Sequence, residues 1–324
     1  MTVNEERKML RETVAALVGK HASPAAVRAA MDSDRGYDEA LWRLLCEQVG
    51  AAALVVPEQL GGAGGELADA ATVLQELGRA LVPSPLLGTT LAELALLAAP
   101  EPDAETLEGL AEGRLIGALV LDPDYPEYVV NGDIADVVVA AGDFGLSRWT
   151  RFSAEPVGTM DPTRRLGRVR PEQTEDLGPD PGLADIAAVL LAAEQIGAAE
   201  RCLELTVDYS KSRVQFGRPI GSFQALKHRM ADLYVAVAAA KAVVGEACEE
   251  PTPTNAATAR LAATEALQAV AADGIQLHGG IAITWEHDMH LYFKRAHGSA
   301  HLLDSPRELL GRLEAEICPA APAP

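Results

Sequence analysis

The C-terminal half of the chain carries helical segments far longer than the usual three turns of a globular protein. Apolar residues recur there every three or four positions, which predicts helices at about 183–213, 223–249, 255–277 and 285–297, with a last one from about 305. Ala and Leu abound and aromatic residues make up only 4% of the chain, a balance that favours helix over strand. Such long segments bury their apolar faces against one another, so we expect a four-helix bundle.

The remainder of the chain divides in two. Residues 1–113 have helical spacing, whereas residues 114–180 hold short β-branched runs separated by Gly, Pro and Asp, which are typical of strands. The composition of 171–182 predicts a linker. The predicted fold is mainly α with a small β insert, in the following parts: an N-terminal helical domain at 1–113, a reduced middle β domain at 114–182, a C-terminal helical bundle at 183–316 and a disordered tail at 317–324.

Charge and cysteine usage exclude several classes of function. The formal net charge of −20 would repel nucleic acid and anionic membrane surfaces, so we expect neither as a partner. None of the four cysteines lies at CxxC spacing, which favours reduced thiols. The N-terminal residues are charged and lack the apolar core of a signal peptide, so we expect a cytoplasmic location.

Histidines concentrate near the end of the predicted bundle. Five of the seven lie within 276–304, namely His278, His287, His290, His297 and His301. Pairs three or four residues apart can share a helix face and bind a metal ion. However, the segment has no HExxH sequence and no cysteine at ligand spacing, and Glu286 and Asp288 lie beside the histidines rather than on their face. We therefore expect solvated or interfacial histidines and no metal.

Two other stretches have the properties of an anion or nucleotide site. Gly279 and Gly280 follow a predicted helix and permit close backbone approach. In SRVQFGRPIGSFQ (212–224), Arg213 follows a long helix and can pair with a phosphate, and Phe216 offers a flat apolar surface. The same features also suit an ordinary connection between two helices.

The order of these motifs resembles the acyl-CoA dehydrogenase family. The pattern R-x-QFG-x-PI-x-x-FQ spans 213–224, Q-x-HGG-x-x-x-T spans 276–284, and VPEQLGGAGG with a following helix ending in ELGRAL spans 56–81. The resemblance implies an α–β–α fold, an FAD cofactor, an acyl-CoA substrate and an electron-transfer protein as acceptor. It also implies oxidation of the acyl thioester to the trans-2-enoyl product.

The resemblance also implies which residues bind the cofactor. In this family each flavin lies between two subunits, one of which holds the ring against its β domain while the other holds the ADP half with an arm. The residues that match the arm are Arg213, Gln215, Phe216, Ile220, Phe223 and Gln224 in its first part, and Gln276, Gly279 and Gly280 in its second.

The chain departs from the family where a catalytic base is expected. The two positions that hold a glutamate in relatives fall on Ala187 or Ala188 and on Leu303. Asp304, one residue further on, is a candidate, although Asp at a helix start is more often an N-cap. Glu194 is a second candidate, but a polar position on a long helix needs no catalytic role to explain it. The family's TE-P-x-x-GS flavin loop is absent from 114–180.

These departures lead to a hypothesis of mixed assembly. The residues that match the arm are all present, whereas the expected catalytic base and the family's flavin loop are missing. The chain therefore resembles the short subunit of the α2β2 acyl-CoA dehydrogenases of actinobacterial steroid side-chain degradation, whose longer partner would carry the base. The alternatives are a flavin-free, non-catalytic assembly subunit, a homotetramer that uses Asp304 or Glu194, and a flavin monooxygenase on the same scaffold.

Overall fold

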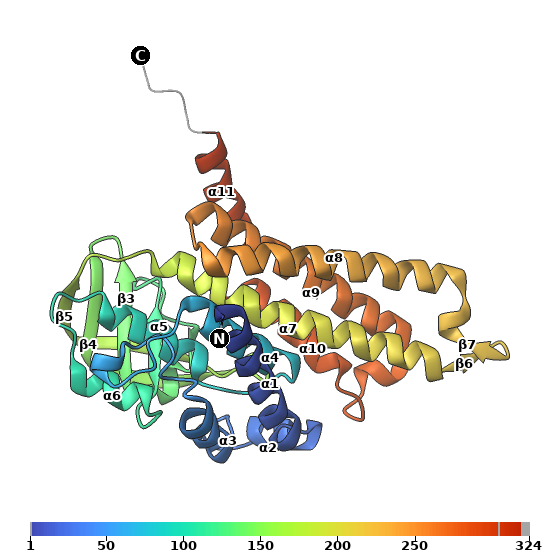
Figure 1. Ribbon diagram of the computed structural model, residues 1–324, viewed down its shortest axis with the longest axis horizontal. Helices are drawn as coiled ribbons and strands as arrows, with labels where there is room; N and C mark the ends of the chain where they lie inside the picture. Colours follow the sequence, from blue (N-terminus) through green and yellow to red (C-terminus); the bar gives the residue numbers. More distant parts are fainter. Residues whose placement is uncertain (1, 304, 319–324) are drawn as a thin grey trace.

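The computed structural model describes residues 2–303 and 305–318 of the chain. Short helices, a small sheet and a long helical bundle follow one another along the sequence (Figure 1). The first part contains α1 (Val3–His21), α2 (Pro24–Met31), α3 (Glu39–Leu44), η1 (Leu45–Val49), η2 (Glu58–Leu60), α4 (Leu67–Arg79), α5 (Leu86–Leu97) and α6 (Ala104–Ala111).

The bundle confirms the predicted C-terminal helices. It consists of α7 (Leu183–Ser212), α8 (Gln224–Glu249), α9 (Pro253–His278) and α10 (Met289–Ala300), and α11 (Pro306–Ile317) packs against α9. Helix α7 lies at the centre, since it packs against α8, α9 and α10 of the bundle and also against α4 and α5. Its residues 189–192 have no exposed surface. Small side chains let neighbouring helices approach this central helix from several sides.

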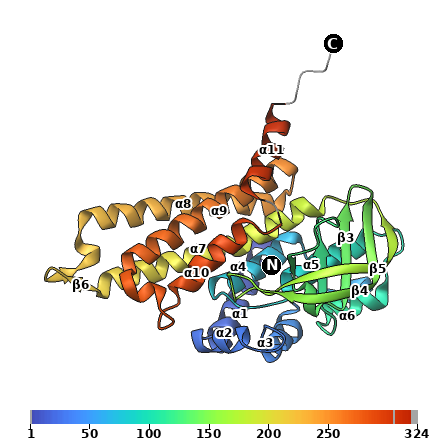
Figure 2. The same ribbon diagram turned by 180° about the vertical axis from the view of Figure 1, so that it is seen from behind.

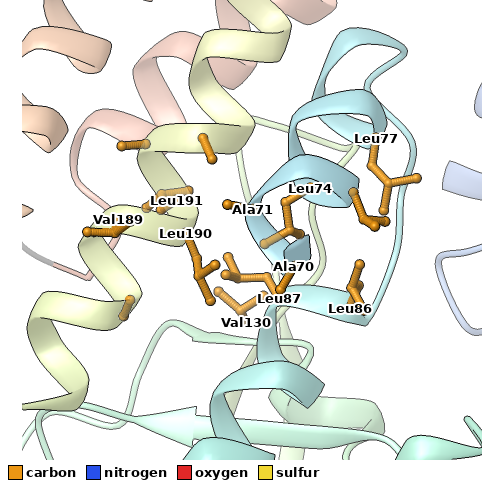
Figure 3. Close-up of a cluster of buried hydrophobic side chains, with 14 of the residues drawn as sticks. Ala70, Ala71, Leu74, Leu77, Leu86, Leu87, Val130, Val189, Leu190 and Leu191 are labelled. Atoms are coloured by element: carbon orange, nitrogen blue, oxygen red, sulfur yellow. The ribbon is translucent and has the colours of Figure 1, made fainter. Parts of the chain in front are cut away.

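One hydrophobic core unites the three parts of the chain. Figure 3 shows side chains of α4, α5 and α7 meeting in it, together with Val130 from the sheet. Helices α4 and α7 come so close that a Cβ on Gly78 would overlap the Glu194 carbonyl oxygen, and one on Gly197 would overlap that of Gln75. The two helix backbones are in direct contact at this crossing, so only glycine fits at these two positions.

The sheet is the smaller part of the fold and has five strands. Its strand order is β1-β3-β4-β5-β2, with β1 and β3 parallel and the other pairs antiparallel. The strands are β1 (Gly117–Val120), β2 (Val129–Val130), β3 (Val137–Gly142), β4 (Gly145–Val157) and β5 (Leu166–Gly178), and the 3-10 turn η3 (Gly132–Ile134) lies between β2 and β3. The mainly α fold with a small β insert is thus confirmed.

The predicted linker at 171–182 is wrong over most of its length. Strand β5 continues to Gly178, and residues 171–178 pair with β4, including Thr174 opposite Trp149. Residues 170–176 are exposed. A two-stranded ribbon that extends beyond the core carries polar residues on both faces, so its composition matches that of a linker.

Among the described residues, no helix is both long enough and apolar enough to cross a membrane.

Candidate functional site

The first part of the predicted arm forms a hairpin at the tip of the bundle. Strands β6 (Val214–Gln215) and β7 (Arg218–Pro219) pair through a two-residue turn, in which Phe216 has φ 52° and Gly217 has φ 75°. Positive φ at both turn residues matches the twist of a hairpin and explains the glycine. The hairpin projects from the end of the bundle (Figure 1), and the Phe216 side chain is 92% exposed.

The residues after the hairpin anchor it to the bundle. Ile220, in the 3-10 turn η4 (Ile220–Ser222), is only 9% exposed. Phe223 is half-buried, and the Arg218 guanidinium lies 4.0 Å from the centre of its ring. Ile220 therefore holds the loop in place, whereas Arg213, Gln215, Phe216 and Gln224 remain exposed.

The second part of the predicted arm lies at the same end of the bundle. Helix α9 ends at His278, whose carbonyl oxygen accepts a hydrogen bond from the Tyr209 hydroxyl at 3.3 Å, and the two rings stack 4.2 Å apart. These contacts join the end of α9 to the end of α7. Gln276, Gly279 and Gly280 are exposed beyond this point. The structure therefore brings both halves of the predicted arm together.

The backbone at the paired glycines leaves room for another molecule. Gly279 has φ 67° and ψ −147°, a conformation that favours glycine. A Cβ built on Gly279 or Gly280 would meet no atom of the chain within 4 Å. The open space lies outside these glycines, where a ligand can approach the main chain closely.

The chemistry of this surface fits the ADP half of FAD. Arg213 is exposed and has no ion pair among the described residues. Helix α8 starts beside it at Gln224, and no side chain caps that end. An uncapped helix N-terminus and a free guanidinium together attract a pyrophosphate. Phe216 adds an exposed aromatic face suited to a flat ring.

The histidines near the arm are packing residues of the bundle end. The Nδ1 atom of His278 lies 2.7 Å from the Gly274 carbonyl oxygen, so it donates a hydrogen bond. The His287 ring lies 4.6 Å from that of His278, measured between centroids. Burial lowers the pKa of His278, His287 and His290. Within the described part of the chain, no group of three His, Cys, Asp or Glu side chains could bind a metal ion.

The positions where the resemblance places a base carry no carboxylate in this chain. Ala187 and Ala188 are buried in α7, at 0% and 3% exposure. Leu303 is half-buried with φ 70°. Asp304 lies outside the described residues. No carboxylate occupies the first expected position.

Glu194, the second candidate base, takes part in two ion pairs. Its Oε1 atom accepts a hydrogen bond from Arg164 Nη2 at 2.7 Å and is also paired with Arg295. The Nε atom of Arg295 binds Asp161 Oδ2 at 2.6 Å. Both guanidinium groups are buried, so the carboxylate of Glu194 has a structural role as their counter-ion.

Around the ion pairs of Glu194, the loop before β5 and the bundle leave little free space between them. The cavity at their junction has a volume of about 20 Å³ and is lined by residues of all three parts, among them Leu87, Asn131, Arg164, Glu194 and Arg295. Pockets for small molecules occupy roughly 300–1,000 Å³. This cavity is therefore too small for a flavin ring or an acyl chain. A larger hollow of about 760 Å³ lies where the sheet meets the start of α7, and its lining includes Leu121, Phe144, Ala184 and Leu303.

The sequence pattern did not predict this ion cluster, which consists of Asp161, Arg164, Glu194 and Arg295. One signal was present in the helix at 289–300, where the buried stripe includes Leu291, Tyr292, Arg295 and Ala296. A charged residue on an apolar stripe indicates a buried ion pair. Asp161, which pairs with Arg295, and Arg164, which pairs with Glu194, come from a loop, which carries no periodic pattern to identify them.

Several known proteins are similar to this chain in sequence and in fold. The N-terminal and C-terminal domain models of acyl-CoA dehydrogenase match residues 4–114 and 184–301. Acyl-CoA dehydrogenase IpdE2 of Mycobacterium tuberculosis is 80% identical over 98% of this chain and 99% of its own.

Two solved structures resemble the whole chain. The ChsE4-ChsE5 complex from Mycobacterium tuberculosis has a TM-score of 0.86 at 25% identity, over 99% of both chains. The Tcur3481-Tcur3483 steroid ACAD, solved as a G363A variant, has a TM-score of 0.85 at 27% identity, over 98% of both chains. Homologues in this family are FAD-binding flavoproteins. The chain therefore belongs to the acyl-CoA dehydrogenase family.

Proposed function

We propose that this chain is a subunit of an FAD-dependent acyl-CoA dehydrogenase that desaturates an acyl-CoA thioester between its α and β carbons. In this assembly the chain supplies the arm that holds the ADP half of FAD. A longer homologous subunit supplies the β domain that faces the flavin ring and the carboxylate base. The complex is an α2β2 heterotetramer in the cytoplasm, and an electron-transfer protein accepts its electrons.

The position of the arm carries this proposal. The sheet lies at the start of α7 and the hairpin at its end, at opposite ends of the molecule in both views (Figures 1 and 2). Helix α7 has 30 residues, so at 1.5 Å per residue about 45 Å separates its two ends. The arm therefore cannot serve a ligand bound to its own sheet. A ligand that it holds must extend from another subunit.

The nature of the partner is supported by the missing base and by the relatives. A second copy of this chain would present the same alanines at 187 and 188. A longer relative that carries a base meets this need. One similar structure is a complex of two differently named proteins, and the other is described as a steroid ACAD. We therefore propose steroid side-chain thioesters as the substrate class.

The residues of this chain bind and orient the cofactor rather than transfer protons. Bound FAD supplies the hydride acceptor for the β-carbon. Arg213 and the first amides of α8 neutralise the pyrophosphate. Gly279 and Gly280 let the main chain approach it, while Gln215, Gln224 and Gln276 offer amides that both donate and accept hydrogen bonds. Phe216 stacks against a flat ring, with Phe223 and Ile220 supporting it from below.

Co-expression with the longer homologue tests the proposal. The co-purified complex should be yellow, with equal amounts of the two chains and one FAD for each pair, as measured by mass and by flavin absorbance. The isolated chain should be colourless and inactive. Full flavin loading and dehydrogenase activity in the isolated chain would refute the mixed assembly. A complex that forms without any flavin would favour the non-catalytic assembly subunit instead.

A further inference from the structure

We propose that the segment directly after the paired glycines is a docking surface for the longer subunit that brings the flavin. This docking surface consists of Ile281, Ile283 and Trp285, together with the hollow beside them. The inference rests on the proposed function, because it takes from there the existence of a second, longer chain. It adds the place where this chain binds that partner through protein contacts rather than through the cofactor.

Three large apolar side chains are exposed within this short stretch. Ile281, Ile283 and Trp285 are 39%, 72% and 62% exposed. The chain's other two tryptophans, Trp42 and Trp149, are only 5% and 3% exposed. Contiguous exposed apolar groups mark binding surfaces, and tryptophan is enriched among the residues that contribute most to protein–protein binding. The exposure of Trp285 therefore indicates a protein partner.

The Trp285 ring is held in place although it is exposed. The Lys294 ammonium lies 4.8 Å from the centre of the ring, and the His290 ring contacts it edge-on with a centroid distance of 4.7 Å. Both of these residues lie on α10, whereas Trp285 lies in the segment before that helix. A side chain that is already ordered loses little conformational entropy on binding, which increases the affinity. Trp285 is therefore suited to be the anchor of an interface.

The hollow beside Trp285 offers space for a side chain of the partner. It has a volume of about 330 Å³, and its lining includes Ile275, Ile283, Phe293 and His290. The His290 side chain is buried, and its Nε2 atom has no hydrogen-bond partner among the described residues. A buried polar atom is costly unless it is bonded. The hollow therefore suits an apolar side chain of the partner that carries a polar end.

The place of the docking surface on the chain determines what covers it. Ile281 directly follows Gly280, and the chain from Gly280 to Trp285 spans at most about 18 Å. A standard interface covers about 800 Å² on each partner, which corresponds to a patch roughly 30 Å across. A subunit that brings a cofactor to the glycines and forms such an interface therefore also covers the docking surface. A second copy of this chain would bring no base, so the occupant is the longer subunit.

Truncation of the anchor tests the docking surface. Trp285→Ala should raise the Kd between this chain and the longer subunit by at least about 30-fold, as expected for loss of a tryptophan at a binding hot spot. Ile283→Asp, which places a charge in the apolar surface, should act in the same direction. Phe144→Ala removes a fully exposed ring at the sheet end and is the matched control, so its Kd should equal that of the wild type. Native mass spectrometry on a dilution series of each co-purified complex measures the Kd.

Photo-crosslinking identifies the molecule that covers the docking surface. We expect p-benzoylphenylalanine at position 285 to cross-link to the longer subunit in the complex, and the same group at position 144 not to do so. A cross-link from position 285 to a second copy of this chain, or no cross-link at all, would overturn the docking surface. Wild-type Kd values for both Trp285→Ala and Ile283→Asp would overturn it as well.

Arg213→Ala separates this inference from the proposed function. That variant should lower the flavin content of the complex while the two chains still assemble, whereas Trp285→Ala should separate the chains. If the wild-type chain binds the longer subunit and Trp285→Ala binds it equally well, only the docking surface is wrong. If the wild-type chain forms no complex with the longer subunit, the proposed function is wrong and the docking surface with it.

Discussion

Glu93 on α5 is the most isolated charged residue of the interior. It has no exposed surface, and neither of its carboxyl oxygens has a hydrogen-bond partner among the described residues. Burial raises the pKa of this carboxyl well above its usual range. In the folded chain Glu93 therefore retains a proton that the unfolded chain releases.

This burial makes stability depend on pH in a defined direction. The folded pKa lies above the unfolded one, so the free energy of unfolding is highest below the ordinary pKa of Glu. It falls as the pH rises towards the folded pKa, by up to about 1.4 kcal/mol per pH unit. We expect Glu93→Met to raise the free energy of unfolding by about 1–3 kcal/mol at neutral pH, and by more at pH 8 than at pH 6.

Denaturant unfolding between pH 5 and pH 8 checks this prediction. Glu47→Met is the matched control, because Glu47 lies nearby in the helical part but is exposed. Its effect should be small and independent of pH. A Glu93→Met effect that is the same at every pH would show that the carboxyl does not titrate as a buried acid.

Arg213 is the residue on which the proposed cofactor arm most depends. Arg213→Ala should weaken FAD retention by the complex by about 1.5–3 kcal/mol, as expected for loss of a charge-assisted hydrogen bond. The measurement is the dissociation constant of FAD, followed by flavin fluorescence. Arg170→Ala, at an exposed position of β5, is the control. An unchanged constant for Arg213→Ala would remove Arg213 from the site.

The close crossing of α4 and α7 leaves no room for a side chain at Gly197, whereas Gly245 on α8 has open space around it. At Gly197 a Cβ would overlap the Gln75 carbonyl oxygen, whereas at Gly245 on α8 it would meet no atom within 4 Å. Alanine favours a helix over glycine by roughly 1 kcal/mol. We expect Gly245→Ala to stabilise the chain by up to that amount.

Gly197→Ala should have the reverse effect. The added methyl group forces α4 away from α7, so the free energy of unfolding should fall by about 1–3 kcal/mol despite the gain in helix propensity. Thermal unfolding of both variants tests both expectations, a lower Tm for Gly197→Ala and a higher Tm for Gly245→Ala. Stabilisation by Gly197→Ala would contradict the close crossing of these helices.

The elements differ in how well the sequence predicts them. The helices at 183–212 and 224–249 match their predicted ranges closely, because apolar residues recur along many turns. Strand residues 171–176 did not match, because both of their faces are exposed and carry no alternation. The hairpin at 214–219 was predicted only as a loop, although Gly217 after Phe216 is a turn signal.

At the scale of the whole molecule, binding and proton transfer are separated between subunits in our proposal. The arm and the sheet stand at opposite ends of the molecule (Figure 2), and α7 between them carries alanines at 187 and 188. The base must then come from the partner. We expect Asp304→Asn to leave the kcat of the complex nearly unchanged.

Steady-state assay of the co-purified complex tests this expectation. General-base catalysis contributes about 10²–10⁴ to a rate, so a loss of that size in the Asp304→Asn variant would assign the base to this chain. Substitution of the glutamate at the family position of the longer subunit serves as the positive control. It should produce a loss of that order.

The sequence alone determined the long helices and the small β insert and supplied the candidate residues of the proposed arm, because periodic patterns and short motifs depend on neighbours close along the chain. Only the tertiary structure showed the ion cluster, since Asp161, Glu194 and Arg295 come from three distant segments and no local pattern links them. Tertiary structure also decided that the arm lies about 45 Å from its own sheet, because that distance follows from the length and direction of one packed helix. The charge of a residue such as Glu194 is visible in the sequence, but whether it is a base or a buried partner depends on what surrounds it.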